Sequence, residues 1–109
     1  MRETSEIVLL VNPFRVFEGK EAEFLALWDQ TSAIFKAKPG FVSAKLLRAH
    51  PSQAPGQTPP FTHLNVAEWD SPEAYAEALK DPELRRLGGR YAQVCTFDPA
   101  LYQALRTLH

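Results

Sequence analysis

Residues 61–73 read Phe61-Thr62-His63-Leu64-Asn65-Val66-Ala67-Glu68-Trp69-Asp70-Ser71-Pro72-Glu73 and decide the fold, because a strand in them passes directly into a helix. Aromatic and β-branched residues are frequent over residues 61–69 and alternate between two faces, which predicts the strand. A helix start follows at once. Ser71 suits the N-cap, Pro72 the first helical position, and Glu73 the positively polarised first turn.

Upstream of this stretch, the sequence predicts two strands separated by a helix. Residues 7–14 are apolar on both alternating faces and predict a strand covered on both sides, and residues 41–49 predict a second strand. Between them, apolar residues recur at helical spacing over about residues 20–37, and Lys38-Pro39-Gly40 predicts the end of this helix. Its predicted inward face consists of Phe24, Leu27, Trp28, Thr31, Ile34 and Phe35.

Downstream, the helix that starts at Ser71 buries Tyr75, Ala78 and Leu79 in this reading. Asp81-Pro82-Glu83 repeats the start signal and predicts a short helical piece to Leu87, which Gly88-Gly89 ends. Residues 90–97 predict a fourth strand. The last segment begins at Asp98-Pro99 and has apolar residues at helical spacing: Leu101, Tyr102, Leu105 and Leu108. The proline-rich residues 50–60 predict a long loop, either a lid over a cavity or a hairpin tip.

The predicted order β-α-β-β-α-β is that of a ferredoxin-like α+β fold with one four-stranded antiparallel sheet. Both helices then cover the same face of the sheet. The other face has no cover, although the first strand contributes apolar residues to it, and an apolar patch of that size is unusual on a monomer. We therefore expect a homodimer in which two chains pack sheet against sheet.

Length and composition narrow the class of protein. With 109 residues, the chain is expected to form a single domain over residues 1–109. The net charge of −1 gives no basic excess for nucleic acid, and Cys95 alone provides neither a disulfide nor a cysteine metal cage. The apolar run at residues 7–11 follows an acidic N-terminal stretch, is too short to span a membrane, and resembles no signal peptide, so we expect a cytoplasmic protein without a membrane partner.

The strand over residues 61–69 also carries the candidate site. Side chains two residues apart share a face, so His63, Asn65 and Trp69 point the same way. If this face meets the helices, it lies against Phe24, Trp28, Tyr75 and Leu79 and forms an apolar cavity with a few polar groups, as small-molecule sites have. The alternative is that Asn65 and Trp69 are core polar groups with hydrogen-bond partners inside the protein.

Four segments together resemble the antibiotic biosynthesis monooxygenase family, and the likeness covers roughly residues 6–100. They are Asn12-Pro13-Phe14, residues 18–24 (Glu-Gly-Lys-Glu-Ala-Glu-Phe), residues 38–43 (Lys-Pro-Gly-Phe-Val-Ser) and residues 65–74, from Asn65 to Ala74. The resemblance implies a dimeric α+β barrel. In one branch of the family, it also implies an oxygenase without cofactor or metal that turns an aromatic phenol into a quinone.

In that branch the resemblance implies an Asn and a Trp four residues apart and an Arg about twenty residues later. Asn65 and Trp69 match the spacing, and the arginine is Arg90, with Arg86 as the second candidate. The chemistry needs a dry slot for an electron-rich ring and N–H donors for developing negative charge, and Asn65 and Trp69 carry such donors. The residues expected to contact a small aromatic or hydrophobic ligand are Phe24, Trp28, His63, Tyr75 and Arg86.

Three other possibilities remain open at this point. A second branch of the family consists of haem-degrading monooxygenases, and Asn12 and Trp69 fit its pattern. Residues 70–97 contain no histidine, however, and Gly88 falls near the place of the haem ligand, so the chain would be a homologue lacking the usual His. The second possibility is a non-catalytic dimeric protein that holds a small hydrophobic ligand. The third is a purely structural protein whose cavity is closed by Trp28 and Trp69.

Overall fold

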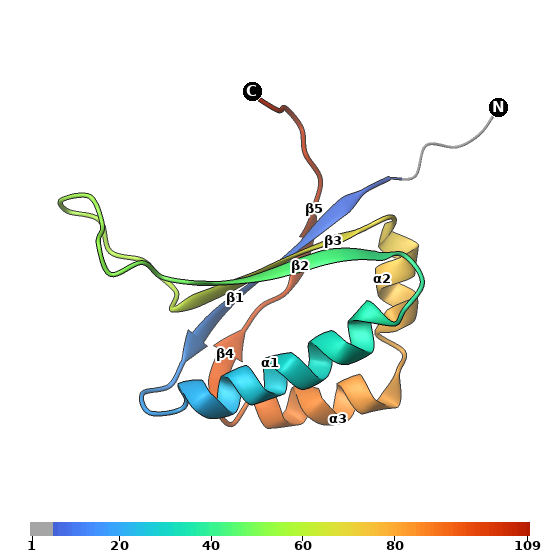
Figure 1. Cartoon of the computed structure of the whole chain (residues 1–109), viewed down its shortest axis with the longest axis horizontal. Helices are drawn as coiled ribbons and strands as arrows, with labels where there is room; N and C mark the ends of the chain where they lie inside the picture. The colour runs from blue at the N-terminus through green and yellow to red at the C-terminus, as the bar shows by residue number, and fades with distance from the viewer. Residues whose placement is uncertain (1–5) are drawn as a thin grey trace.

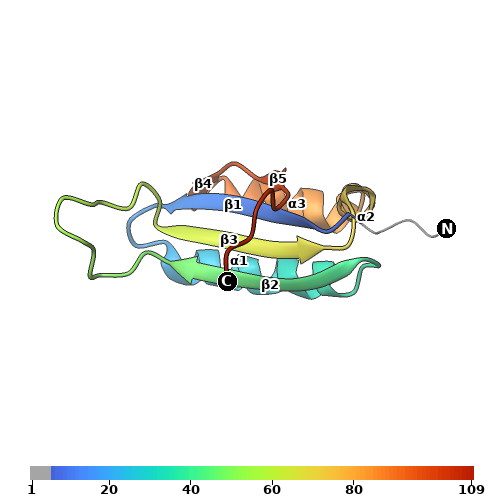
Figure 2. The same ribbon diagram turned by 90° about the horizontal axis from the view of Figure 1, so that it is seen from above.

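The computed structural model describes residues 6–109, and the first part of the acidic N-terminal stretch, residues 1–5, lies outside them. The described chain forms a twisted antiparallel sheet with three helices on one face, as Figures 1 and 2 show from two sides. The elements are β1 (Val8–Val16), α1 (Glu21–Lys36), β2 (Phe41–Arg48), β3 (His63–Trp69), α2 (Pro72–Ala78), α3 (Pro82–Tyr91), β4 (Cys95–Phe97) and β5 (Ala100–Tyr102). The predicted ferredoxin-like α+β fold is confirmed.

The helix starts follow the local signals in the sequence. The Ser71 side chain accepts a hydrogen bond from the Ala74 N–H at 3.1 Å, and Asp81 caps α3 by accepting from the Glu83 N–H at 2.9 Å. A proline occupies the first turn of both helices. These caps satisfy N–H groups that have no partner inside the helix, so both starts lie where the sequence predicts them.

The sheet has five strands, so the prediction of four is wrong. The strand order is β2-β3-β1-β4. Strand β5 also pairs with β1, along the part of the same edge that β4 does not reach. The helical spacing of the C-terminal leucines does not correspond to a helix. Strand β4 covers only part of the β1 edge, so residues 100–102 pair with the rest of that edge as a strand. Leu101 packs on the core, whereas Leu105 and Leu108 are 82% and 97% exposed on a C-terminal segment without regular structure.

The fourth strand also begins later than predicted, because α3 continues through Gly88-Gly89 to Tyr91 and leaves only residues 95–97 for β4. A glycine inside a helix costs about 1 kcal/mol relative to alanine. Leu84, Leu87 and Tyr91 are all buried from one face of α3, and burying a large apolar side chain stabilises by about 1.5–3 kcal/mol each. Burial therefore outweighs the two glycines.

The core lies between the sheet and the helices in two clusters. One surrounds Phe14, Phe24 and Leu87, and the other surrounds Leu10 and Trp69. The opposite face of the sheet carries Leu9, Val11, Leu47, Leu64 and Val66 by alternation, and no helix covers it in the described chain. None of the helices within residues 6–109 has the length and apolar character required to cross a bilayer.

Gly40 connects α1 to the sheet in a way that permits no side chain. Its φ is +89°, and a Cβ there would lie within 3.0 Å of Ala74 Cβ and Asp70 Oδ1. We expect Gly40→Ala to lower the free energy of unfolding by about 3 kcal/mol, the sum of left-handed backbone strain and overpacking. Urea unfolding measures this. Gly19→Ala is the control, since Gly19 has a φ of +80° with no atom near, and an equal loss at both positions would contradict the steric argument.

Candidate active site

The inward face of the sheet brings polar side chains beneath the helices. Antiparallel pairing places Asn12 opposite Asn65, Leu10 opposite Ala67 and Val8 opposite Trp69. Alternation turns these side chains toward α1, α2 and α3, because residues two apart share a face. Two amides and an indole therefore lie on this face among apolar side chains, and His63 lies on the same face near its end.

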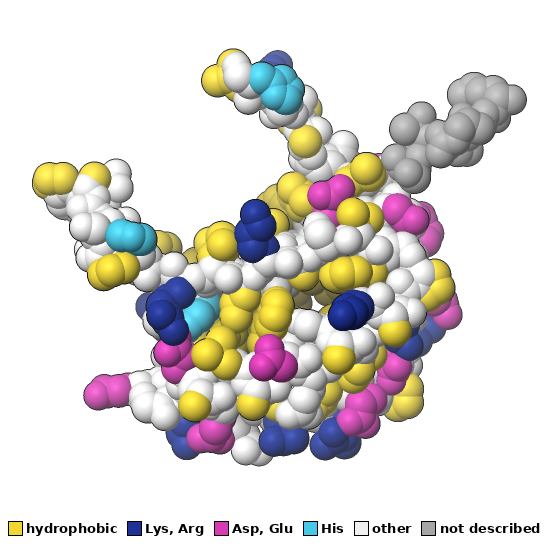
Figure 3. All heavy atoms as spheres, in the orientation of Figure 1, with side chains coloured by type: hydrophobic (Ala, Val, Ile, Leu, Met, Phe, Trp, Pro, Cys, Tyr) yellow, Lys and Arg dark blue, Asp and Glu magenta, His cyan; other side chains and the backbone are white. Residues whose placement is uncertain are grey.

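A cavity of about 170 Å³ lies between this face and the helices. Figure 3 shows hydrophobic side chains in a hollow between the sheet and α1. The sheet contributes Asn12, Phe41, Asn65 and Trp69, α1 contributes Trp28, Thr31 and Phe35, and α2 and α3 contribute Tyr75, Gly88 and Tyr91, among others. No Asp, Glu, Lys, Arg or His of the described chain is among the lining residues. An apolar cavity of about 150 Å³ binds benzene, so this one accommodates a single aromatic ring.

Asn65 is held by a tryptophan on α1. The Trp28 Nε1–H donates to Asn65 Oδ1 at 2.9 Å, and an indole nitrogen can only donate. The bond therefore assigns the amide oxygen to Trp28 and turns the NH₂ group, with its two donors, elsewhere. Asn65 is half-buried and lines the cavity.

Trp69 contributes a donor that has no partner. Its side chain is 1% exposed, and the rings of Phe35, Phe41 and Tyr75 surround it in edge-on contacts with centroid distances of 5.4–5.7 Å. Among the described residues, its Nε1 is a buried atom without a hydrogen bond. A buried donor left unsatisfied costs about 1–3 kcal/mol. An acceptor atom on a ligand in the cavity would remove that cost.

Two tyrosines add hydroxyl groups to the lining, and neither is an ionised base at neutral pH. Tyr91 Oη and Thr31 Oγ1 share a hydrogen bond of 2.8 Å, and burial raises the pKa of Tyr91 to about 12. Burial also raises the pKa of Tyr75 above its ordinary value. The lining formed by residues 6–109 therefore presents neutral hydrogen-bonding groups and no carboxylate, imidazole or amine to remove a proton.

The structure brings four of the eight predicted site residues together: Trp28, Asn65, Trp69 and Tyr75 all line the cavity. Arg86 and Arg90 do not. Both are exposed on α3, where Leu84, Leu87 and Tyr91 occupy the inward face, and Arg86 pairs with Glu83. The predicted contact of an arginine with a bound anion therefore has no support from their placement.

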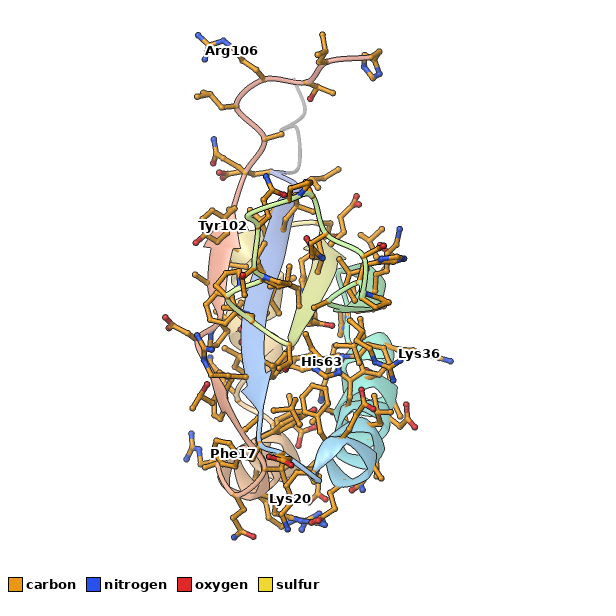
Figure 4. The ribbon with its side chains drawn as sticks, turned by 90° about the vertical axis from the view of Figure 1, so that its left-hand side faces the viewer. Phe17, Lys20, Lys36, His63, Tyr102 and Arg106 are labelled. Atoms are coloured by element: carbon orange, nitrogen blue, oxygen red, sulfur yellow. The ribbon has the colours of Figure 1, made fainter. Side chains whose placement is uncertain are left out.

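Phe24 and His63 lie in the core beside the cavity and are not part of its lining. His63 is 5% exposed, its ring lies 5.0 Å from that of Phe24, and Figure 4 shows it between the sheet and α1. Nε2 contacts Glu21 Oε2 at 2.9 Å and Nδ1 contacts Thr62 Oγ1 at 2.8 Å, so both ring nitrogens have protein partners. His63 shares a strand face with Trp69, but that face continues past the end of the cavity.

The lining also contains residues that sequence reasoning missed. Thr31 and Tyr91 were expected only as parts of helices or strands, and Phe97 was assigned no role. Asn12 lines the cavity as well, and its Oδ1 accepts a hydrogen bond from the Asp98 N–H at 3.0 Å. The helical spacing of Leu84, Leu87 and Tyr91 was the available signal for Tyr91, and it was obscured by Gly88-Gly89.

Gly88 sets the size of the cavity on the α3 side. A Cβ at Gly88 or Gly89 would meet no atom within 4 Å, but only Gly88 lines the cavity. We expect alanine at either position to raise the free energy of unfolding by about 0.5–1 kcal/mol. Gly88→Ala should in addition weaken binding of a single-ring hydroquinone about 10-fold, the effect of one methyl group in a close-fitting pocket. Calorimetric titration checks this, and equal affinity in the two variants would contradict the assignment.

Glu21 makes the stability of the fold depend on pH. Its hydrogen bonds to His63 and then to Arg48 lower the pKa of this carboxyl below the ordinary value of 4.5. A lowered pKa stabilises the fold above the ordinary value, and the contribution is lost as pH falls through the folded-state pKa. We expect the stability difference between the wild type and Glu21→Gln to shrink as pH falls below about 4.5. Urea unfolding at a series of pH values measures it, and a constant difference would contradict the pKa shift.

Residues 7–88 match the family described as antibiotic biosynthesis monooxygenase, and the chain belongs to this family. A curated relative, deoxynogalonate monooxygenase from Streptomyces nogalater, is 31% identical over 101 residues, which are 93% of this chain and 79% of the relative. The crystal structure of SnoaB, a cofactor-independent oxygenase from Streptomyces nogalater, is 30% identical with a TM-score of 0.79, and the match covers 94% of this chain and 97% of that one.

A more distant structure shares the fold alone. A mutant of MhuD, solved with two manganese protoporphyrin IX molecules per active site, is 21% identical with a TM-score of 0.65. That match covers 94% of this chain and 98% of the MhuD chain. The family model and the curated relative thus confirm the predicted family.

Proposed function

We propose that the protein is a cofactor-independent monooxygenase that oxidises an electron-rich aromatic molecule, such as a phenol or hydroquinone, with O₂. The observation that carries the proposal is an aromatic cavity lined by Asn65 and by Trp69, whose N–H has no partner among the described residues. The likeness to a cofactor-independent oxygenase over most of both chains supports it.

The reactive species is an electron-rich anion of the substrate, and the role of the protein is to bind and stabilise this anion. A phenolate can pass an electron to O₂, which reacts slowly with neutral closed-shell molecules. In the overall reaction, one oxygen atom ends in the quinone, and the other leaves as water with the two hydrogens that the phenol loses. Asn65 and Trp69 donate hydrogen bonds to the anionic oxygens, and the rings of Phe35, Phe41 and Tyr75 exclude water.

Oxygen uptake tests the proposal directly. The protein is mixed with a panel of hydroquinones and hydroxyanthrones, and O₂ consumption and quinone absorbance are followed against the uncatalysed oxidation. With ¹⁸O₂, oxidation of a phenol or hydroxyanthrone to its quinone should place one labelled atom in the product and the other in water. A hydroquinone should do so only where the product is a hydroxyquinone, because its dehydrogenation to the plain quinone incorporates no oxygen. The cavity volume favours single-ring hydroquinones, and larger substrates require movement of its wall. Uptake no faster than in buffer for the whole panel would refute the proposal.

A non-catalytic binding protein is the second candidate, and the absence of a charged side chain from the described lining favours it. The unpartnered Trp69 donor calls for a ligand acceptor in either case. Turnover separates the two functions. In a binding protein, Asn65→Ala should change ligand affinity alone, and no quinone should form.

The described residues do not fit a haem-degrading activity. No histidine lines the cavity, and residue 88, near the place where that branch would put its haem ligand, is a glycine. Asn12 and Trp69 do lie in the lining as this branch requires. A haem titration should therefore produce no saturable shift of the Soret band.

We further propose that the protein is a homodimer through the helix-free face of the sheet. Leu9, Val11, Leu64 and Val66 form its centre, with Leu47 40% exposed at one side and Tyr102 58% exposed at the other. Apolar side chains spread over four strands are typical of an interface rather than of a free surface. Light scattering at micromolar concentration should give twice the chain mass, and a monomer mass would refute the proposal.

A further inference from the structure

Trp28 lines the cavity and also contacts the residue on which the proposed chemistry depends. It lies on α1, whereas Asn65 lies on β3, and the only side-chain hydrogen bond of the Trp28 indole in the described chain joins them at 2.9 Å. The contact links a helix to the strand across the cavity wall. Removing it would leave the backbone pairing of β3 with β1 and β2 intact.

An asparagine amide can present either of two opposite faces to a ligand. Its oxygen accepts and its NH₂ group donates, and a rotation by half a turn exchanges them. Because the Trp28 N–H can only donate, the Asn65 oxygen must face it, and the NH₂ group is directed away from Trp28. With a rotating amide, a ligand anion would meet an acceptor for part of the time.

We infer that Trp28 is a positioning residue that locks the Asn65 amide so that a ligand in the cavity meets N–H donors instead of the amide oxygen. The inference deepens the proposed function and rests on it for the ligand, an aromatic oxygen anion. With Trp69 contributing a further N–H, the cavity selects an anionic oxygen acceptor over a neutral ring of the same size.

Two small probes separate this role from simple packing. 4-Nitrophenol, at a pH at which it is ionised, carries the oxygen anion, and nitrobenzene has the same ring without it. We expect Trp28→Phe to weaken binding of the nitrophenolate about 10-fold, because a hydrogen bond to a charged group is lost or weakened. Binding of nitrobenzene should change less than twofold, since the variant keeps an aromatic ring on α1.

The matched control is Phe35→Leu, which changes another α1 side chain of the lining that makes no hydrogen bond. It should weaken both probes equally. In an Asn65→Ala background, Trp28→Phe should have no further effect on the preference for the anion, because the amide that it orients is gone. Equal losses of both probes in Trp28→Phe, or additive effects of the two substitutions, would overturn the inference.

A measurement on the folded protein covers the case in which Trp28→Phe does not fold. The Trp28 indole N–H should exchange slowly with solvent in the wild type and faster in Asn65→Ala. In Asn65→Asp it should stay protected, because a carboxylate oxygen still accepts, yet nitrophenolate should bind more weakly than to Asn65→Ala. Fast exchange in the wild type, or no saturable binding of nitrophenolate by it, would overturn the inference.

These outcomes are distinct from failure of the proposed function. If the wild type consumes no O₂ with any hydroquinone but shows the coupled preference for the anion, the oxygenase proposal fails and the role of Trp28 stands. If O₂ is consumed but the two substitutions act independently, the role of Trp28 fails alone.

Discussion

Asn65→Ala is expected to lower the rate of O₂-dependent turnover about 100-fold, the effect of removing one preorganised donor from developing negative charge. Asn65 is well placed for such a loss, because it lines the cavity and its amide oxygen accepts a hydrogen bond from Trp28. The cost in stability should be of similar size or smaller, since a 100-fold change in rate corresponds to about 2.7 kcal/mol. Asn65 is half-buried, but its removal leaves the Trp28 N–H without its acceptor, at about 1–3 kcal/mol if water cannot reach it.

The measurement is initial O₂ uptake with the best hydroquinone of the panel, compared with the free energy of unfolding from urea titration. Asn65→Asp is a useful companion, since it keeps an acceptor for Trp28 and replaces the donors with a charge that repels the anion. We expect it to be at least as slow as Asn65→Ala. A variant with normal turnover and lowered stability would assign Asn65 to the core.

Trp69→Phe is the second substitution with a large expected effect. It should lower turnover strongly while changing the free energy of unfolding less than Asn65→Ala does. It removes the N–H that has no partner among the described residues while keeping an aromatic ring among Phe35, Phe41 and Tyr75. Turnover should fall by about 10- to 100-fold with the lost donor. The free energy of unfolding should change by no more than about 1–2 kcal/mol, because the smaller ring leaves a space while the unsatisfied donor disappears.

The control for this variant is Phe41→Leu, which alters a neighbouring ring of the lining and leaves the Trp69 indole in place. It should lose stability through packing and retain most of the turnover. If Trp69→Phe instead loses several kcal/mol and turns over normally, the indole is a packing residue and its N–H has no part in the reaction.

Local signals predicted the elements of the fold that depend on neighbouring residues. Ser71 and Asp81 start helices through side-chain caps that span two or three positions, and sequence reasoning identified both. Strand β5 depends on the edge of β1 that β4 leaves free, about ninety residues away in the chain. No periodicity within residues 98–109 reports such an edge, so the spacing of the leucines was misread as helical.

Strand alternation led to residues that line the cavity, whereas the family's spacing along the chain led to arginines that the structure leaves outside it. Asn65 and Trp69 share a face of β3 and both line the cavity. Arg86 and Arg90 follow from the spacing that the family resemblance implies, and a spacing does not report the rotation of α3, which turns Leu87 and Tyr91 inward. His63 and Phe24 lie on the predicted inward faces of β3 and α1, but beyond the end of the cavity. Where the cavity ends depends on how α1 crosses the sheet, which the sequence pattern does not report.

The Trp69 indole, which has no hydrogen-bond partner within residues 6–109, also makes thermal denaturation a means of finding the natural ligand. A molecule that supplies the missing acceptor binds only the native state, so at a hundredfold excess over its Kd it adds about 2.7 kcal/mol to the stability. For a chain of this size, that corresponds to a rise in melting temperature of about 10 °C or more. Metabolite extracts can therefore be ranked by the melting temperature that they confer, before any reaction is known.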